Sequence, residues 1–342
     1  MKILLAQPRG VCAGVDRAVK IVEIALERFG PPLYVRREIV HNRHTVQRLR
    51  ARGVVFVDEL DEVPDEALVV FSAHGVSPAV KSEASRRGLR AIDATCPLVA
   101  KVHQEVLRNV ERDRSLVLIG HAGHDEVVGT VGHAPQAITL VTSVEDARTV
   151  ALPRQRPLVA LTQTTLSLDD TAEILAELRR RFPRLEQPAA DDICSATQNR
   201  QNAGKAMAER VDLLRVVGSA NSSNAARLVE VGQARGVAGH LIDDETEIDP
   251  LWLQGVETVG LTSGASTPEA LVQRVIDRLR ELGAHSMEAC ETVDNCPSAW
   301  RCIRMMDADK YGTCSDGSPG AACRLDEDCV SNNCDGVWRF CH

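Results

Sequence analysis

The chain has 342 residues, of which 44% are hydrophobic and 26% charged, a balance typical of a soluble globular protein long enough for two or three domains. Its net charge of −8 and its aromatic content of 3% argue against a nucleic-acid-binding surface, which needs basic residues and stacking aromatics. No apolar run approaches the roughly 20 residues that span a bilayer, so we expect no membrane segment and a cytoplasmic protein.

Short apolar, β-branched runs alternate with amphipathic segments along the first 285 residues. The amphipathic pattern is clearest over residues 18–29, 171–182 and 271–282, which we predict to be helices. The apolar runs predict strands at residues 2–6, 32–35, 54–57, 67–73, 89–93, 115–120, 137–142, 157–163, 212–218, 239–243 and 258–264.

Strands that alternate with helices indicate α/β units with mainly parallel sheets, covered on both faces. We therefore predict an α/β fold with three similar domains at residues 1–96, 97–193 and 194–285. A fourth segment, residues 286–342, differs from the rest of the chain in its high cysteine content.

Three single cysteines stand in similar settings. Cys12, Cys96 and Cys194 each follow a short apolar run and a polar or glycine turn, and each precedes helix-like sequence. The N-terminus of a helix favours thiolate over thiol, so three convergent thiolates could hold a metal ion or an iron–sulfur cluster and leave one position open for chemistry. Spacing alone also allows three unrelated small apolar residues near strand ends, because distant single cysteines match no compact metal motif.

Polar loops follow many of the predicted strands. Hydroxyl and amide residues that open a helix, with exposed backbone N–H groups, suit a phosphate or a diphosphate. A single loop of this kind is more often a helix cap, so only the joint presence of several favours a shared site. Glu126 would be a general acid if its surroundings raise its pKa. The loops contain His41, His74, His124 and the segments 162–165, 218–224 and 262–266.

The fingerprints of serine hydrolases, P-loop proteins and Rossmann dinucleotide-binding proteins are absent from the sequence. Nine other segments occur in a fixed order: PRGVCAGVDRAV, VHNRHTV, FSAHGVS, DATCPLVAKVH, GHAGHDEVVGT, LTQTTLS, DDICSATQNRQ, GSANSSNAARL and TSGAST. In order and spacing they resemble the 4-hydroxy-3-methylbut-2-enyl diphosphate reductases, iron–sulfur enzymes of the non-mevalonate isoprenoid pathway. The resemblance covers about residues 1–285.

The resemblance implies a trefoil of three α/β domains around a central cavity that holds a [4Fe–4S] cluster, with Cys12, Cys96 and Cys194 as its ligands. The fourth iron would bind the substrate hydroxyl, and two electrons from an external ferredoxin or flavodoxin would break the C–O bond. Glu126, Thr164 and His124 would then be the catalytic residues, with Glu126 delivering protons and Thr164 positioning the hydroxyl. The implied substrate-binding residues are His41, His74, His124, Thr164, Ser222, Ser223, Asn224 and Ser266.

The reaction implied in this way is the reductive dehydroxylation of the diphosphate substrate to isopentenyl and dimethylallyl diphosphate, with release of water. Two other classes of function are kept open by the residues themselves. One is a cysteine-rich binding or surface protein whose α/β body is a scaffold, and the other is a thiol-based redox enzyme without a metal. The second predicts paired cysteines in the body, whereas the three body cysteines lie far apart in the sequence.

The last 57 residues contain eight of the eleven cysteines. This density is typical of a disulfide-stapled module of secreted proteins, in conflict with a cytoplasmic iron–sulfur enzyme. No C-x-x-C pair is present, which argues against a zinc ribbon, and the disulfide connectivity cannot be assigned. A disordered arm of reduced thiols, a docking segment and a gene fusion all remain open for these residues.

Overall fold

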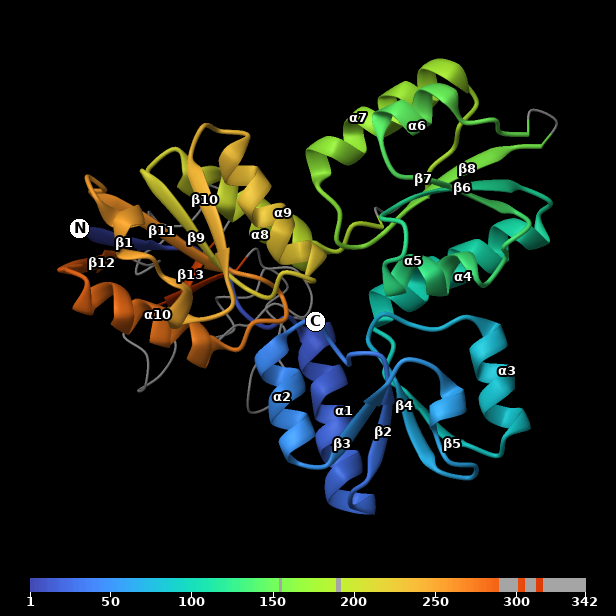
Figure 1. Ribbon diagram of the computed structural model, residues 1–342. Coiled ribbons are helices and arrows are strands. Elements are labelled where there is room, and N and C mark those ends of the chain that lie inside the picture. The colour runs from blue at the N-terminus through green and yellow to red at the C-terminus, as the bar shows by residue number, and fades with distance from the viewer. Residues whose placement is uncertain (154–155, 189–191, 289–300, 305–311, 316–342) are drawn as a thin grey trace. The chain divides into compact units, whose positions relative to one another are not determined.

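The computed structural model describes residues 1–153, 156–188, 192–288, 301–304 and 312–315. The chain divides into two compact units, and Figure 1 labels their helices and strands. The larger unit contains residues 11–198 and 221–224, and the second unit contains residues 1–10, 199–220 and those from 225 onward.

The first half of the larger unit is a parallel four-stranded sheet in the order β3-β2-β4-β5. Side chains alternate between its faces: Leu33 and Val35 pack with α1, whereas Tyr34 between them packs on the other face with α3. Both faces are therefore buried, as the near-continuous apolar runs of these strands require. The elements are α1 (Ala13–Phe29), β2 (Leu33–Arg36), α2 (Arg43–Ala51), β3 (Val54–Val57), η1 (Leu60–Glu62), β4 (Leu68–Phe71), α3 (Pro78–Arg86) and β5 (Arg90–Asp93).

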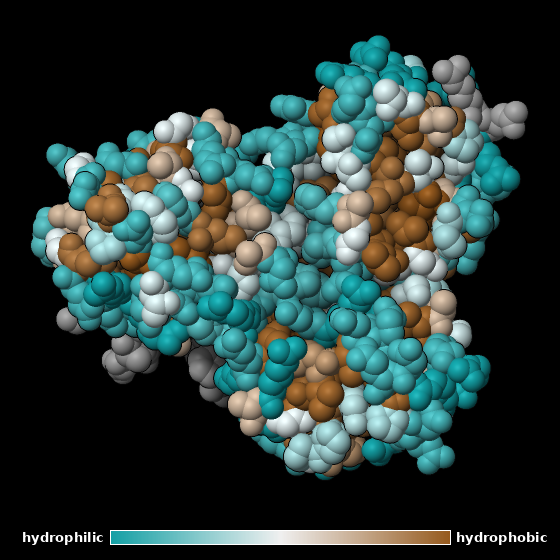
Figure 2. Space-filling view, viewed as in Figure 1, coloured by the Kyte–Doolittle hydropathy of each residue, from teal (hydrophilic) through white to brown (hydrophobic). Residues whose placement is uncertain are grey.

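The second half of the larger unit is a parallel three-stranded sheet in the order β7-β6-β8. The same alternation holds: Val117 and Ile119 of β6 face α6 and α7, whereas Leu116 faces α4 and α5. The solvent-exposed sides of helices α3 and α7 carry charged residues, and Figure 2 shows hydrophilic surface over these helices. The elements are α4 (Pro97–Glu111), β6 (Ser115–Ile119), α5 (Asp125–Val131), β7 (Ile138–Val141), α6 (Val144–Thr149), β8 (Leu158–Thr162) and α7 (Leu168–Arg181).

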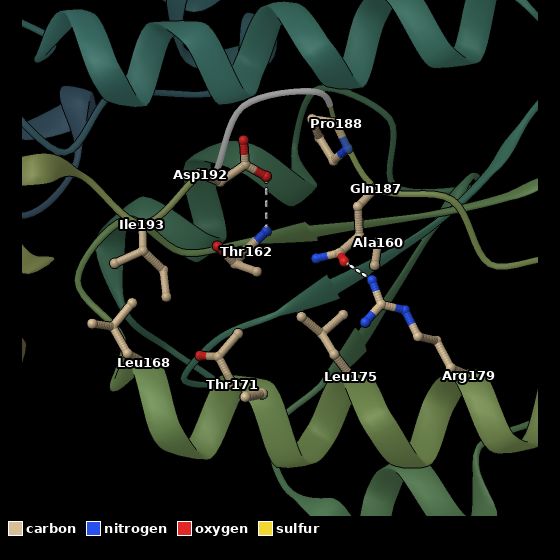
Figure 3. A pocket seen from close by; sticks show the side chains of 11 residues that line it. Ala160, Thr162, Leu168, Thr171, Leu175, Arg179, Gln187, Pro188, Asp192 and Ile193 are labelled. Carbon is tan, nitrogen blue, oxygen red and sulfur yellow. Dashed lines mark hydrogen bonds between the residues drawn. The ribbon is translucent and has the colours of Figure 1, made fainter.

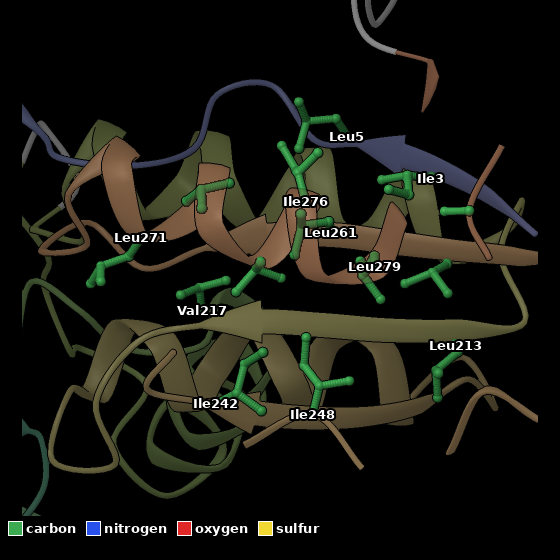
Figure 4. Close-up of a cluster of buried hydrophobic side chains, with 14 residues drawn as sticks. Ile3, Leu5, Leu213, Val217, Ile242, Ile248, Leu261, Leu271, Ile276 and Leu279 are labelled. Atoms are coloured by element: carbon green, nitrogen blue, oxygen red, sulfur yellow. The ribbon is translucent and has the colours of Figure 1, made fainter. Parts of the chain in front are cut away.

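The second unit has a parallel five-stranded sheet in the order β10-β9-β11-β1-β12. Helix α10 covers one face, where Ile276 and Leu279 pack against Leu261 and its neighbours (Figure 4). Burial of each such side chain stabilises the fold by about 1.5–3 kcal/mol. The elements are β1 (Lys2–Leu5), most of α8 (Ser195–Ala208), β9 (Leu213–Val217), most of α9 (Ser223–Gln233), β10 (Ala238–Ile242), η2 (Glu245–Glu247), η3 (Pro250–Leu253), β11 (Thr258–Ser263), α10 (Glu269–Glu281) and β12 (Ser286–Glu288).

The predicted α/β class with parallel sheets is confirmed, and a strand is found in each of the eleven predicted runs. The division into domains after residues 96, 193 and 285 stays a prediction, with two differences at its edges. Strand β1, assigned to the first domain, lies in the sheet of the second unit, because β11 and β12 supply hydrogen-bonding neighbours on both of its sides. Strand β12 continues that sheet to Glu288, three residues beyond the predicted end of the body.

Within the part of the chain that the structure describes, no helix has the length and apolar character needed to cross a membrane. In the C-terminal segment, β13 (Arg301–Arg304) and β14 (Gly312–Ser315) form an antiparallel pair. Most of the predicted cysteine-rich module, together with the possible final strand at residues 291–295, lies outside the described residues.

Candidate active site

Each of the three body cysteines stands at the start of a helix. The backbone carbonyls of Cys12, Cys96 and Cys194 accept N–H groups from α1, α4 and α8 at 2.9, 2.9 and 3.0 Å. Two of the cysteines follow strands as predicted, whereas Cys194 follows a loop joined to β8 through a single bridge at Glu186. All three are half-buried free thiols of the larger unit. The positive ends of three helices are thus combined with three sulfur atoms.

The three thiols belong to one region of the larger unit. A Cβ on Gly14, in the first turn of α1, would lie 2.6 Å from the Sγ of Cys96, so only glycine leaves room for that sulfur. Burial raises the pKa of the thiols of Cys96 and Cys194, and the nearby charges of Cys12 and Glu126 raise both further. Several thiolates and a carboxylate this close together repel each other unless a cation lies between them. The donor set therefore fits iron held by cysteine thiolates.

A buried carboxyl group lies beside these thiols. Glu126, in the first turn of α5, is 3% exposed. Its two oxygens accept the backbone N–H of Thr164 at 2.6 Å and the hydroxyl of Thr164 at 2.9 Å. Burial raises the pKa of Glu126 to about 7, although the hydrogen bonds from Thr164 favour the charged form. A carboxyl group that is half protonated near neutral pH is suited to donate a proton.

Three histidines from separate loops meet in the same unit. The rings of His41 and His74 are stacked with centroids 4.0 Å apart, and the ring of His124 lies edge-on at 5.3 and 5.9 Å. Burial lowers the pKa of His74 well below 6.5 and that of His124 to about 4, and the neighbouring imidazoles act in the same direction. Imidazole groups so close together offer several hydrogen-bond donors to one anion.

One of the three histidines, His124, contacts the acid directly. His124 is the N-cap of α5, and its Nδ1 accepts the backbone N–H of Glu126 at 3.2 Å. His41 follows β2 and precedes the N-cap Asn42 of α2, and His74 follows β4. The strands β2 and β4 are parallel neighbours and end at the same edge of their sheet, so the loops of His41 and His74 lie close together there.

The polar turn at residues 221–224 also belongs to the larger unit. Asn221 donates to Glu38 at 2.8 Å, and Ser223 donates to the carbonyl of Thr165 at 3.4 Å. Asn224 donates at 3.3 Å to the hydroxyl of Thr197, which itself lies 3.1 Å from the sulfur of Cys194. The turn that carries three of the predicted substrate ligands therefore touches both the loop of His41 and the start of α8.

Of the predicted site residues, the structure brings together the three cysteines, Glu126, Thr164, the three histidines and residues 222–224 in the larger unit. Ser266 is buried in the second unit, in the turn before α10. Thr197 was not among the predicted site residues, and Asn221 and Asp125 were predicted only as members of polar loops, without a role. Thr197 stands three residues after Cys194 in the first turn of a helix, and this spacing was the signal that could have identified it.

Asp192 holds the segment before Cys194 in place. One of its oxygens accepts the backbone N–H of Thr162 at 3.1 Å (Figure 3), and the other pairs with Lys101 at 3.3 Å. The carboxylate lines a cavity of about 260 Å³ between β8 and α7, beside Leu168, Thr171 and Leu175 of that helix (Figure 3). The backbone N–H of Cys194 then donates to the carbonyl of Thr164 at 3.0 Å. Asp192 thus ties the segment before Cys194 to the end of β8, two residues before Thr164.

Comparisons with known proteins agree on one family. A model of the LytB protein family matches residues 3–280. A 4-hydroxy-3-methylbut-2-enyl diphosphate reductase of Cutibacterium acnes is 60% identical over 82% of this chain and 88% of its own length. One of Rhodococcus opacus is 58% identical over 86% of this chain and 88% of its own length.

Two solved structures that resemble this chain are also diphosphate reductases. The E-1-hydroxy-2-methyl-but-2-enyl-4-diphosphate reductase of Plasmodium falciparum superposes with a TM-score of 0.81 at 39% identity, over 87% of this chain and 95% of that one. A structure of (E)-4-hydroxy-3-methyl-but-2-enyl diphosphate reductase, described as the terminal enzyme of the non-mevalonate pathway, gives a TM-score of 0.58 at 31% identity. It covers 82% of this chain and 99% of that one.

Proposed function

The chain belongs to the LytB family, and from this membership we propose that it catalyses the reductive dehydroxylation of 4-hydroxy-3-methylbut-2-enyl diphosphate. The substrate takes up two electrons and two protons, loses its hydroxyl group as water, and becomes isopentenyl or dimethylallyl diphosphate. The observation that carries this proposal is the buried Glu126–Thr164 pair beside three cysteines at helix N-termini.

The cysteines are the proposed ligands of the cofactor. Cys12, Cys96 and Cys194 would hold a [4Fe–4S] cluster, since thiolates are the usual ligands of iron–sulfur iron and the three helix ends favour the ionised sulfur. When bound, this cluster supplies the electrons one at a time and an iron that lacks a cysteine, open to the substrate hydroxyl. Gly14 leaves the space that the sulfur of Cys96 occupies.

The diphosphate is assigned to the polar side chains around the histidines. The stacked pair of His41 and His74, with His124 edge-on to both, offers three imidazole groups within one small area. Each would donate an N–H to a phosphate oxygen, and uptake of protons there would strengthen the contact. The other proposed substrate ligands are Thr164, Ser222, Ser223, Asn224 and Ser266.

Glu126 is the proposed proton donor. Its carboxyl group is buried, its pKa is raised to about 7, and both of its oxygens are fixed by Thr164. Thr164 can therefore bind the substrate hydroxyl and pass it a proton from Glu126, so that the oxygen leaves as water and not as hydroxide. A second proton added to either of two carbons gives the two isomeric products.

The electrons must come from another protein, because the sequence has no flavin or nicotinamide fingerprint. We assign this role to a ferredoxin or a flavodoxin, which both carry single electrons. A cytoplasmic location belongs to the same proposal, since cysteine ligands must stay reduced to bind iron.

An anaerobic turnover assay tests the proposal. The full-length chain, purified without oxygen, is mixed with the diphosphate substrate and reduced methyl viologen as the electron source. We expect oxidation of two viologens for each product molecule and a mixture of both isomers. A protein that contains a full complement of iron and sulfide yet forms neither isomer would contradict the proposed function.

A further inference from the structure

A carboxylate stands unexpectedly close to the three histidines. Asp125 opens helix α5 between His124 and Glu126, and its Oδ2 lies 3.9 Å from the Nδ1 of His74. Only 14% of its side chain is exposed, so little water screens its charge. Like charges repel strongly in such surroundings, and an uncompensated Asp125 would oppose a phosphate group bound by the same histidines.

The guanidinium of Arg37 compensates that charge. Its Nη1 donates to Asp125 Oδ1 at 2.6 Å, and its Nη2 donates to Glu59 at 3.2 Å. Glu59 is itself fixed by Arg36, which donates to both of its oxygens at 2.9 and 2.7 Å. The arginine is therefore held at both prongs of its planar fork, and it joins the loop after β2 to the first residue of α5.

The backbone at Arg37 supports a dedicated role. Its φ of +57° lies in the left-handed region, which residues other than glycine rarely adopt. Its backbone N–H donates to the carbonyl of Val57 at 2.6 Å, so the end of β3 holds the turn in this form. Strained turns of this kind persist where their surroundings fix them, and they concentrate at functional sites. The same loop leads to His41 four residues later.

The second carboxylate in this loop is also paired. Glu38 lies 3.4 Å from His41 Nδ1 and accepts the amide of Asn221 at 2.8 Å. Of these two carboxylates, Asp125 has a direct ion pair with an arginine, whereas Glu38 is hydrogen-bonded to His41 and Asn221.

We propose that Arg37 is a positioning residue for diphosphate binding, which neutralises the charge of Asp125 beside the three histidines. This inference rests on the proposed binding of the diphosphate at the three histidines. It assigns to the Arg37–Asp125 pair an effect on substrate affinity that is separate from the chemical step.

The test is a double-mutant cycle on the anaerobic full-length holoenzyme. KM and kcat are measured for the substrate, and Kd is measured by calorimetry for inorganic diphosphate as the probe. Arg37→Met should raise KM and Kd about tenfold while kcat changes less than about twofold, the size expected for a directly interacting charge pair. Asp125→Asn should change Kd by less than about threefold, and the double variant should return to within about threefold of the parent.

Arg48→Met is the matched control, because Arg48 of α2 is half exposed and pairs with Glu23 of α1. It should leave Kd unchanged. Thermal unfolding of every variant separates loss of affinity from loss of fold. If Arg37→Met does not fold, Arg37→Lys keeps the charge without the fork, and it should still weaken binding, although by less.

Two results would overturn the proposal. One is an unchanged Kd in folded Arg37→Met, and the other is a double variant that binds as weakly as Arg37→Met, which would make Arg37 only a structural link. A parent chain that binds inorganic diphosphate but reduces no substrate contradicts the proposed reaction, and the cycle of Kd values still decides the role of Arg37. A parent that binds no diphosphate would overturn both.

Discussion

Glu126 combines two properties that a proton donor needs. It is buried enough for its pKa to rise to about 7. Both of its oxygens are hydrogen-bonded to Thr164, so its proton is positioned for transfer to that residue. The residue type and its place after His124 were visible in the sequence, but its burial and its bond to Thr164 were not. The two residues are 38 positions apart, and they meet only because β6 and β8 are neighbours in one sheet.

Replacement of the acid tests this role. We expect Glu126→Gln to lower kcat at least about 100-fold, because the amide keeps the shape of the side chain but cannot donate an acidic proton. Iron content and the Kd for inorganic diphosphate should stay within about twofold of the parent. Glu173→Gln on the exposed side of α7 is the control and should be fully active. Near-normal turnover of Glu126→Gln would remove this residue from the mechanism.

The raised pKa of Glu126 also predicts a pH dependence. A proton donor acts in its protonated form, which is populated below the pKa of about 7 and lost above it. We therefore expect kcat to fall as pH rises through about 7, with iron content unchanged over the same range. The check is kcat measured from about pH 6 to 9 at saturating substrate. A kcat that increases over this interval would mean that the ionised carboxylate is the active form.

The first turn of helix α1 packs against the sulfur of Cys96 and limits the space around it. The sequence predicted a helix after Cys12, but the need for glycine at position 14 follows from tertiary packing. A Cβ there would lie 2.6 Å from the sulfur of Cys96, whereas a Cβ on Gly204 of α8 would have Val231 as its nearest neighbour, at 3.6 Å. The two glycines therefore form a matched pair of helical positions.

Alanine at these two positions should have opposite effects. Alanine is favoured over glycine within a helix by about 1 kcal/mol, so Gly204→Ala should keep its iron and unfold at the same or a higher temperature. Gly14→Ala should displace the sulfur of Cys96 and lose at least about half of its iron, with the fold retained. Iron content and circular dichroism measured on both variants give the answer. Full iron content in Gly14→Ala would show that this sulfur can move freely.

The local elements were predictable to a much greater degree than their pairing. Each of the eleven apolar runs became a strand, because β-branched segments between glycine and polar turns carry a local signal. The strand β12 has the sequence Ser-Met-Glu, which carries no such signal, and it forms because β1 offers a free edge. The place of β1 between β11 and β12 depends on contacts more than 250 residues apart in the chain.

For the whole molecule, the two alternatives to a reductase lose their support. Membership of the LytB family and the high coverage of its members argue against a body that is only a scaffold. The curated relatives at 58–60% identity are diphosphate reductases, which argues against a thiol-based redox enzyme without a metal. The cysteine-rich segment after Glu288 is left without an assigned role, and only its hairpin of β13 and β14 is described.

Truncation separates that segment from the body. A chain that ends at Glu288 keeps β12, whose last residue pairs with Lys2 and, at 3.2 Å, with Arg210. We expect it to retain iron and turnover within about twofold of the full-length chain. A chain that ends at His285 lacks β12 and should unfold at a lower temperature, because the edge of β1 is exposed. Loss of turnover in the chain that ends at Glu288 would give the C-terminal segment a part in catalysis.

A count of iron and acid-labile sulfide tests whether Cys12, Cys96 and Cys194, at the starts of three helices, hold the redox centre of this protein. The full-length chain is purified without oxygen beside a variant with serine at Cys12, Cys96 and Cys194. We predict about four irons and four sulfides per parent chain and fewer than about one in the variant. Equal iron in the two proteins, or none in the parent after anaerobic reconstitution, would contradict the account.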